Sequence, residues 1–446
     1  MPVRNVWMPV AVVLAAAAML GPAGRAGAAA PAGKGWPMRQ EGGYLVVETT
    51  HYTVRTDHSA EIAQAIASQQ EVLFGQLYQR MGGVKPGVAV PRLELRVLKT
   101  EEKYLEVAGK DAKNTQGQHS EARSWLVAWG PPDNLDQLFE TFRHEGTHQF
   151  VAQFIGAQTP IWLNEGLAEF FKNAQFRDGK LVIGQAPVMV VNSLKRAVAE
   201  KKLIPVDKML TLKVDDWNLA VKMEKPEAFI QYEEAWAMVH FLEGGDGGKY
   251  RTPFCQYMYH LSRGSNSQQA WEKAFGAGTA AFEKRFIEYL KDLKPTGGMG
   301  CRMNMQVLAY LLLNMRRDER CDKDITTFRN AALEGKLGEW TFTGTDGTKI
   351  TTADHEFLKS MFRCEQDSSK GDEPSYELAP GKEDEPAIIR CRHHLGYVLE
   401  TRYVKEAKTG KLKPEIVALP AVQSKSAPGA GAGPAAAPAP AGAKKQ

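Results

Sequence analysis

The stretch HEGTH, at His144–His148, is followed fourteen residues later by WLNEGLAE, at Trp162–Glu169. On a helix, residues four apart lie on the same face, so the imidazoles of His144 and His148 can reach one metal ion. Glu145 is rotated by about 100° around that helix and would lie beside a metal-bound water, where a general base is needed. Two histidines and a glutamate are an established ligand set for catalytic zinc. The pattern therefore predicts a zinc hydrolase site with Glu165 as the third ligand.

The residues around HEGTH have helical periodicity. Apolar side chains recur at helical spacing, namely Leu135, Leu138, Phe139, Phe142 and Phe150. A second helix is predicted from Thr159-Pro160, with Thr159 as its N-cap, to about Asn173. Gly146 costs a helix about 1 kcal/mol relative to Ala, which indicates close approach of a neighbouring element. The competing interpretation is that the histidines and glutamates are polar residues on a helix surface and hold no metal.

The sequence predicts an α+β protein. Strand patterns at 44–56, 92–98 and 124–129 alternate with a helical pattern at 60–81, and residues 188–293 are almost entirely helical. We therefore expect a small mixed sheet followed by helices over residues 40–295. The chain has 446 residues, which is enough for two domains. Its net charge of +4 is small and no long Lys/Arg run occurs, which argues against nucleic-acid binding.

The first residues have the features of a secretory signal peptide. Arg4 precedes an apolar stretch at 10–20, and small residues follow, so residues 1–28 are predicted to be removed. No segment reaches about 18 uninterrupted apolar residues, so no membrane span is expected in the mature chain. The protein is predicted to be exported, either to the periplasm or to the medium.

Residues 300–420 are predicted to form a small α+β domain, with a helix near 303–316, a strand pair around Asp346-Gly347 and a long strand near 387–404. All five cysteines occur late in the chain, and the last four, Cys301, Cys321, Cys364 and Cys391, allow three disulfide pairings. Pairing Cys301 with Cys321 and Cys364 with Cys391 closes the shortest loops, and four free thiols are the alternative. The Ala/Gly/Pro/Lys tail at 424–446 is predicted to be disordered.

The HEGTH and WLNEGLAE segments resemble the gluzincin clan of metallopeptidases, and most closely its uncharacterised bacterial peptidase-MA-like group. The similarity runs from about Tyr44 to Leu293 and leaves residues 300–420 uncovered. It implies that His144, His148 and Glu165 bind Zn²⁺, that Glu145 is the base and that Glu169 orients a ligand histidine. In such enzymes an edge strand before the first motif binds substrate, and residues 124–129 are the candidate.

The resemblance also makes Tyr232 a candidate donor to the oxyanion, because a Tyr or His well downstream of the third ligand often has this role. The alternative is that Tyr232 packs at the edge of the core. His240, eight residues later, is predicted to be a core histidine with its hydrogen bonds satisfied. Arg143 is expected to be either a solvated helix arginine or a ligand for a substrate carboxylate. The spacing of the remaining histidines does not match a metal-binding motif, and we predict no role for them.

This sequence departs from related peptidase families at several positions, and these differences narrow the range of activities that we expect. Metzincins need glycine and histidine where this chain has Val151 and Phe154, so that branch is excluded. Residues 105–130 contain no Met-Glu-Asn sequence to hold a free amine, so an endopeptidase is favoured over an aminopeptidase. Peptide or protein substrates are expected. Two alternatives stay open: a catalytically inactive gluzincin-fold binding protein, and a zinc amidase that acts on a non-peptide amide.

Overall fold

The computed structural model describes sixteen stretches of the chain, and all structural statements below refer to them. They are residues 35–80, 92–113, 115–120, 125–131, 135–156, 158–177, 179–222, 226–296, 300–314, 323–339, 341–343, 349–364, 374–382, 385–392, 397–407 and 409–420. The predicted signal peptide, the predicted tail, Cys321 and the pair His393-His394 lie outside the described residues.

The amino-terminal part contains a six-stranded mixed sheet, in the order β1-β2-β3-β4-β6-β5. Its strands are β1 (Met38–Glu41), β2 (Tyr44–Glu48), β3 (Tyr52–Thr56), β4 (Leu93–Leu98), β5 (Gly117–Ser120) and β6 (Trp125–Trp129). Strands β3, β4 and β6 are parallel, whereas β5 is antiparallel to β6. The prediction that residues 124–129 form the edge strand is wrong, because β6 is paired on both sides. Among the described strands, β5 is the edge on this side of the sheet, and β1 is the edge on the other side.

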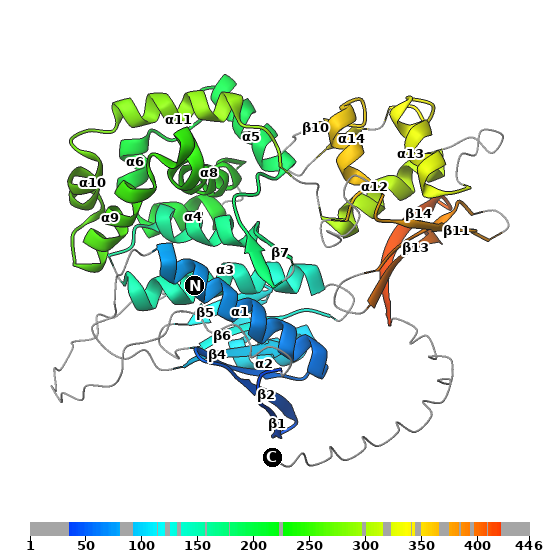
Figure 1. Ribbon diagram of the computed structural model, residues 1–446, viewed down its shortest axis with the longest axis horizontal. Helices are drawn as coiled ribbons and strands as arrows, with labels where there is room; N and C mark the ends of the chain where they lie inside the picture. Colours follow the sequence, from blue (N-terminus) through cyan, green and yellow to red (C-terminus); the bar gives the residue numbers. More distant parts are fainter. Residues whose placement is uncertain are drawn as a thin grey trace, which may run out of the picture.

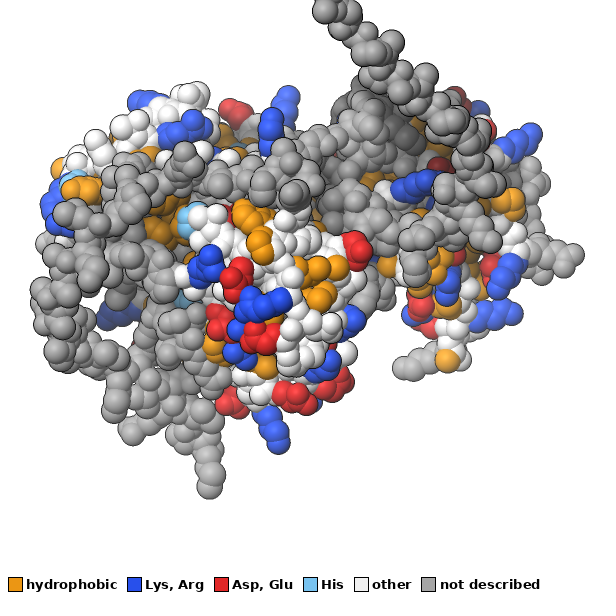
Figure 2. Space-filling view, turned by 60° about the horizontal axis from the view of Figure 1, so that its bottom comes forward, with side chains coloured by type: hydrophobic (Ala, Val, Ile, Leu, Met, Phe, Trp, Pro, Cys, Tyr) orange, Lys and Arg blue, Asp and Glu red, His pale blue; other side chains and the backbone are white. Residues whose placement is uncertain are grey.

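The two faces of this sheet differ in polarity, as the alternation along each strand requires. Helices α1 (Ala60–Arg80) and α3 (Leu135–Phe154) cover one face (Figure 1). Phe74 of α1 packs edge-on against Phe150 and Phe154 of α3. The other face carries α2 (Glu101–Ala108) over β4 and β6. The part of this face that α2 does not cover carries ion pairs between strands, such as Arg39–Glu48 and Arg55–Glu41. Figure 2 shows positive and negative side chains mixed at this end of the molecule.

A helical layer follows α3 along the chain. Its elements are α4 (Ile161–Lys172), the hairpin β7 (Gln175–Arg177) and β8 (Lys180–Val182), α5 (Val188–Ala199), α6 (Val206–Thr211), α7 (Val214–Lys222), α8 (Pro226–Gly248), α9 (Arg251–Ser262), α10 (Ser267–Phe275) and α11 (Ala280–Asp292). In Figure 1 these helices lie above α3, with the sheet below it. Thr159 is not the N-cap of α4, because Pro160 occupies that position and the Thr159 hydroxyl donates to the carbonyl of Gly156.

The carboxy-terminal part has its own sheets, β9 (Thr341–Thr343) with β10 (Lys349–Thr351), and β11 (Glu377–Ala379), β12 (Ile388–Arg392), β13 (Tyr397–Lys405) and β14 (Leu412–Pro420). Helices α12 (Cys301–Asn314), α13 (Ile325–Leu333) and α14 (His355–Met361) accompany them. The long strand predicted near 387–404 is two antiparallel strands, β12 and β13. A disulfide joins Cys301 to Cys364, so the shortest-loop pairing is wrong. Packing of α12 near α14 decides the pairing, rather than distance along the chain.

The α+β class is confirmed, with a small mixed sheet, then helices, then a small carboxy-terminal part with its own sheet. Thr296, which follows α11, is fixed to the loop before α5: its amide donates to the carbonyl of Ala186, and its hydroxyl accepts from the amide of Ala186. Within the described stretches, no helix is long and apolar enough to cross a membrane.

A buried carboxyl group in α8 predicts a pH-dependent stability. Glu234 is 1% exposed, accepts a hydrogen bond from the amide of Ile204 at 2.9 Å, and has a second oxygen without a partner among the described residues. Burial raises the pKa of Glu234 to about 8. Because the pKa of Glu234 is higher in the folded protein than in the unfolded chain, the protonated carboxyl group favours the folded state at low pH. This contribution to the free energy of unfolding is lost as the pH rises through about 8.

We therefore expect Glu234→Gln to increase the free energy of unfolding at pH 9, by on the order of 3 kcal/mol, and to change it little at pH 5. The amide keeps an oxygen for the Ile204 amide and cannot ionise. Urea unfolding at both pH values measures the difference, with the exposed Glu272→Gln as the control. An equal effect of Glu234→Gln at both pH values would contradict the prediction.

Candidate metal centre

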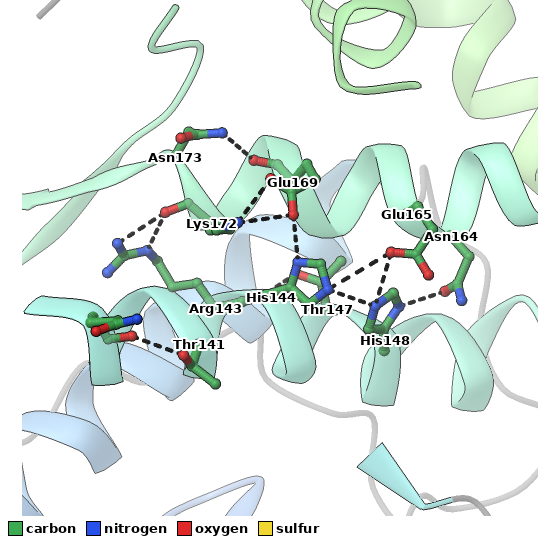
Figure 3. A network of polar contacts seen from close by, with 11 residues as sticks. Thr141, Arg143, His144, Thr147, His148, Asn164, Glu165, Glu169, Lys172 and Asn173 are labelled. Carbon is green, nitrogen blue, oxygen red and sulfur yellow. Dashed lines mark hydrogen bonds and ion pairs between the residues drawn. The ribbon is translucent and has the colours of Figure 1, made fainter. Parts of the chain in front are cut away.

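Helices α3 and α4 lie side by side and antiparallel, and their facing polar residues form one network (Figure 3). Arg143 of α3 binds the carboxy-terminal end of α4. Its Nε and Nη2 donate to the carbonyl of Lys172, the last residue of α4, at 3.2 and 3.0 Å. The side chain is buried, so both predictions for Arg143 are wrong. It satisfies a carbonyl at a helix C-terminus, where a positive charge is favourable.

The structure brings His144, His148 and Glu165 together at the middle of the two helices. Nε2 of His148 lies 3.0 Å from Nε2 of His144. Oε2 of Glu165 lies 3.6 Å from Nε2 of His148 and 3.8 Å from Nε2 of His144. These side chains are between 13% and 18% exposed, so they are shielded from bulk water but remain accessible from one side.

The outer nitrogens of both imidazoles face acceptors. Nδ1 of His148 lies 3.0 Å from Oδ1 of Asn164, and because an amide oxygen can only accept, this nitrogen carries the proton. Nδ1 of His144 lies 3.2 Å from Oε1 of Glu169, an ion-pair contact rather than a well-aligned hydrogen bond. With protons on both Nδ1 atoms, the two Nε2 lone pairs point at each other and at the Glu165 carboxylate. Such a convergence of lone pairs repels unless a proton on one of the nitrogens or a metal cation lies between them.

The donor set and its spacing fit zinc. Zinc prefers imidazole and carboxylate ligands at about 2.0 to 2.2 Å, which places tetrahedral ligands about 3.4 Å apart. The three separations of 3.0, 3.6 and 3.8 Å lie around that value. The partners of the outer nitrogens, Asn164 and Glu169, are of the kind that orient histidines toward a metal.

Glu169 is itself held by Lys172, whose ammonium donates to Oε1 and Oε2 at 3.1 and 3.2 Å. Burial alone would raise the pKa of Glu169, but His144 and Lys172 outweigh it and lower this pKa to about 2. Burial lowers the pKa of His144, and the carboxylates of Glu169, Glu145 and Glu165 raise it by more. Glu169 is therefore an anion at neutral pH and can hold the His144 ring in one orientation.

Glu145 lies beside the three converging side chains, on the side of α3 that faces β5. A Cβ atom at Gly117 of β5 would stand 3.2 Å from Cγ of Glu145, so the strand passes directly along this side chain. The carboxylate is half-buried, and within the described residues no hydrogen bond or ion pair holds it. It is therefore free to accept a proton from a molecule bound next to the three ligands.

Helix α8 contributes Tyr232 to the same place. The ring of Tyr232 lies edge-on to Trp217 with centroids 4.9 Å apart. Burial, followed by the negative charge of Glu165, raises the pKa of Tyr232 to about 12. The negative charges of Glu169 and Glu145 contribute to the same rise, so the phenol is within electrostatic reach of all three carboxylates. Its O–H is kept at neutral pH and can be donated.

Gly166 sets the distance between α4 and α8. A Cβ atom at this glycine would lie 2.5 Å from the carbonyl oxygen of Ala235 and 3.0 Å from Cγ2 of Val239. The first contact is with helix backbone, which cannot turn aside. Because Gly166 follows Glu165 directly, this close approach brings α8 and its Tyr232 to the level of the cluster.

We expect Gly166→Ala to destabilise the protein by about 1–3 kcal/mol, because an added methyl group overpacks the α4–α8 contact. The displacement of α8 should also lower any activity that depends on Tyr232. Urea unfolding measures the first effect. The control is Gly75→Ala in α1, whose added Cβ meets nothing within 4 Å and should stabilise the helix slightly. Equal stability of the two variants would contradict the role assigned to Gly166.

Two further predictions from the sequence have a structural outcome. His240 is confirmed as a core histidine with its hydrogen bonds satisfied, because Nδ1 contacts the Tyr289 hydroxyl at 2.5 Å and Nε2 the Gly184 carbonyl at 3.1 Å. Gly146 allows another element to approach α3 closely, as predicted, and the atoms that approach belong to side chains of α1. A Cβ atom there would lie 2.6 Å from Oε1 of Gln70 in α1, whose Nε2 donates to the carbonyl of Phe142.

A comparison with known protein families matches the segment that contains the site, but the matching family has no described activity. A family model described as a protein of unknown function (DUF1570) matches residues 139–263, the segment that holds both motifs and Tyr232. No curated protein matches the chain.

Sequence reasoning missed Asn164, Lys172 and Gly166. Lys172 follows Glu169 by three residues on a helix, a spacing that indicates an ion pair and could have been used. Asn164 and Gly166 flank the predicted ligand Glu165, but their contacts depend on where α3 and α8 pack.

Proposed function

We propose that this protein is a zinc-dependent peptidase that hydrolyses internal peptide bonds. The observation that carries the proposal is the convergence of two imidazole nitrogens and a carboxylate oxygen within 3.8 Å of one another, with the Glu145 carboxylate, which pairs with no described residue, beside them. Two imidazole nitrogens and a carboxylate oxygen directed at one point form the kind of donor set that binds zinc.

His144, His148 and Glu165 would hold the zinc ion. Zinc bound there supplies Lewis-acid chemistry: it lowers the pKa of a water ligand and polarises a carbonyl. Asn164 and Glu169 keep the two imidazoles in the tautomer and orientation that binding requires. Lys172 keeps Glu169 ionised at the pH of the reaction.

The remaining residues act on the substrate. Glu145 accepts the proton of the attacking water and passes it to the departing amine, the usual part of a general base that later serves as an acid. Tyr232 donates its O–H to the oxygen on which negative charge develops. The edge of β5 that pairs with no described strand offers backbone N–H and C=O groups to an extended peptide next to Glu145. In this proposal β5 takes the role that the sequence alone assigned to residues 124–129.

We further propose that the protein acts outside the cytoplasm, as the predicted signal peptide implies. The disulfide between Cys301 and Cys364 supports this, because disulfides persist in oxidising compartments and are rare in the cytosol. Whether the compartment is the periplasm or the medium can be followed by fractionating cells that express the full chain.

Metal analysis combined with a peptide-cleavage assay tests the proposal. The purified full chain should contain one zinc ion, and it should cleave members of a mixed peptide library at internal bonds. A chelator should abolish the cleavage and added zinc should restore it. Bound zinc without cleavage of any peptide would favour the binding protein or, if small amides are hydrolysed, the amidase. A chain that takes up no zinc would overturn all three.

A further inference from the structure

His119 lies on the edge strand β5 and has no role in the chemistry described so far. It pairs with Leu126 of β6, two residues beyond the pair Gly117–Ala128. Paired residues of neighbouring strands point to the same face of a sheet, and Leu126 and Ala128 are buried in the core that contains α3. The side chain of His119 therefore points to the α3 side of the sheet, as the Cβ direction of Gly117 does.

The position of Gly117 fixes where His119 lies relative to α3. A Cβ atom at Gly117 would stand 2.6 Å from Cγ2 of Thr141 and 3.2 Å from Cγ of Glu145. His119 is about 7 Å farther along the strand, and His148 is about 4.5 Å farther along α3 than Glu145. The strand and the helix thus bring the two imidazoles to the same level, on the side of the cluster next to Glu145.

Two properties separate His119 from a structural histidine. Both His119 and His240 are partly exposed, but among the described residues no group hydrogen-bonds the ring of His119, whereas both ring nitrogens of His240 are paired. Burial, with a smaller contribution from the nearby His148, lowers the pKa of His119 to about 4. The ring is therefore neutral near pH 7, with one N–H donor and one acceptor available.

We propose that His119 is a substrate-binding residue, which donates a hydrogen bond to a backbone carbonyl of a peptide lying along β5. This rests on the proposed peptidase function. The imidazole stands where an extended chain paired with β5 must pass after crossing Glu145. A neutral donor suits this task, because it binds a carbonyl without adding a positive charge beside a metal. His119 thereby positions the substrate and takes no part in proton transfer.

Cleavage kinetics of His119→Ala and His119→Gln test the proposal, with the library peptide that the wild type cleaves fastest as the substrate. We expect KM to increase by roughly tenfold in His119→Ala, the effect of one lost hydrogen bond with its partner left unpaired. His119→Gln keeps a donor at the same place and should recover most of this loss. Zinc content and thermal unfolding should match the wild type in both variants.

Gln118→Ala is the matched control, because Gln118 is the next residue of β5 and donates to the carbonyl of Ala108 on the opposite face of the sheet. Its KM should not change. Binding of the same peptide to the Glu145→Gln background, with and without His119→Ala, measures affinity independently of turnover. An unchanged KM and affinity in zinc-loaded His119→Ala would overturn this inference alone. A wild type that cleaves no peptide would overturn the proposed function and the role of His119 with it.

Discussion

Replacing Glu145 with Gln should lower kcat by about 10²–10⁴-fold, the usual contribution of a general base. Glutamine has the same shape and cannot accept the proton of the attacking water. The carboxylate has no hydrogen bond or ion pair with any described residue, so its loss should leave the surrounding structure intact. Zinc content, KM and thermal unfolding should therefore stay close to those of the wild type, and steady-state cleavage kinetics measure the change in kcat.

The exposed Glu106→Gln in α2 is the control for this substitution, and its kcat should equal that of the wild type. Equal cleavage by wild type and Glu145→Gln would remove Glu145 from the mechanism. Loss of zinc from Glu145→Gln would instead make Glu145 a metal ligand. Its place beside β5, rather than among the three converging atoms, argues against that outcome.

Tyr232→Phe should lower kcat by about 10²–10³-fold, the cost of removing one donor to an oxyanion. The substitution removes the hydroxyl alone and keeps the ring that packs against Trp217. Stability and zinc content should thus be unchanged. If Tyr232 were only a packing residue at the core edge, Phe would leave kcat at the wild-type level, and kinetics of the two proteins separate these roles.

Tyr250→Phe is the matched control for Tyr232→Phe. The Tyr250 hydroxyl donates at 3.2 Å to Asp246, which lies at the end of α8 opposite Tyr232. Its removal should not change kcat. A similar loss of activity in both variants would indicate that the α8 region responds to any lost hydroxyl, and the role of Tyr232 in the reaction would then be wrong.

The central part of the candidate site could be predicted because it depends on local geometry. His144 and His148 share a helix face by their spacing alone, and Glu145 lies beside them for the same reason. Glu165 required one further inference, that α4 packs along α3. The α+β class followed from periodicity, because alternating and helical patterns are each set by neighbours in the sequence.

Predictions that depended on long-range packing were wrong or incomplete. Residues 124–129 have the apolar pattern of a strand, but no local feature shows that β5 pairs outside them. The sequence pattern places Arg143 on a helix surface. Only the structure shows that α4 ends next to its guanidinium, which donates to the carbonyl of Lys172. The partner of Cys301 is 63 residues away, and loop length gave no guide to it.

The spacing of His144, Glu145 and His148 places two imidazoles and a carboxylate on about one turn of a helix, because helix geometry fixes which residues are neighbours. What surrounds these side chains depends on the packing of the whole chain. The approach of α8 at Gly166, which brings Tyr232 to the cluster, and the placement of His119 beside His148 result from packing between elements distant in the chain. Such contacts form where the free energy of burial is lowest for the whole molecule, and no short stretch of sequence encodes them.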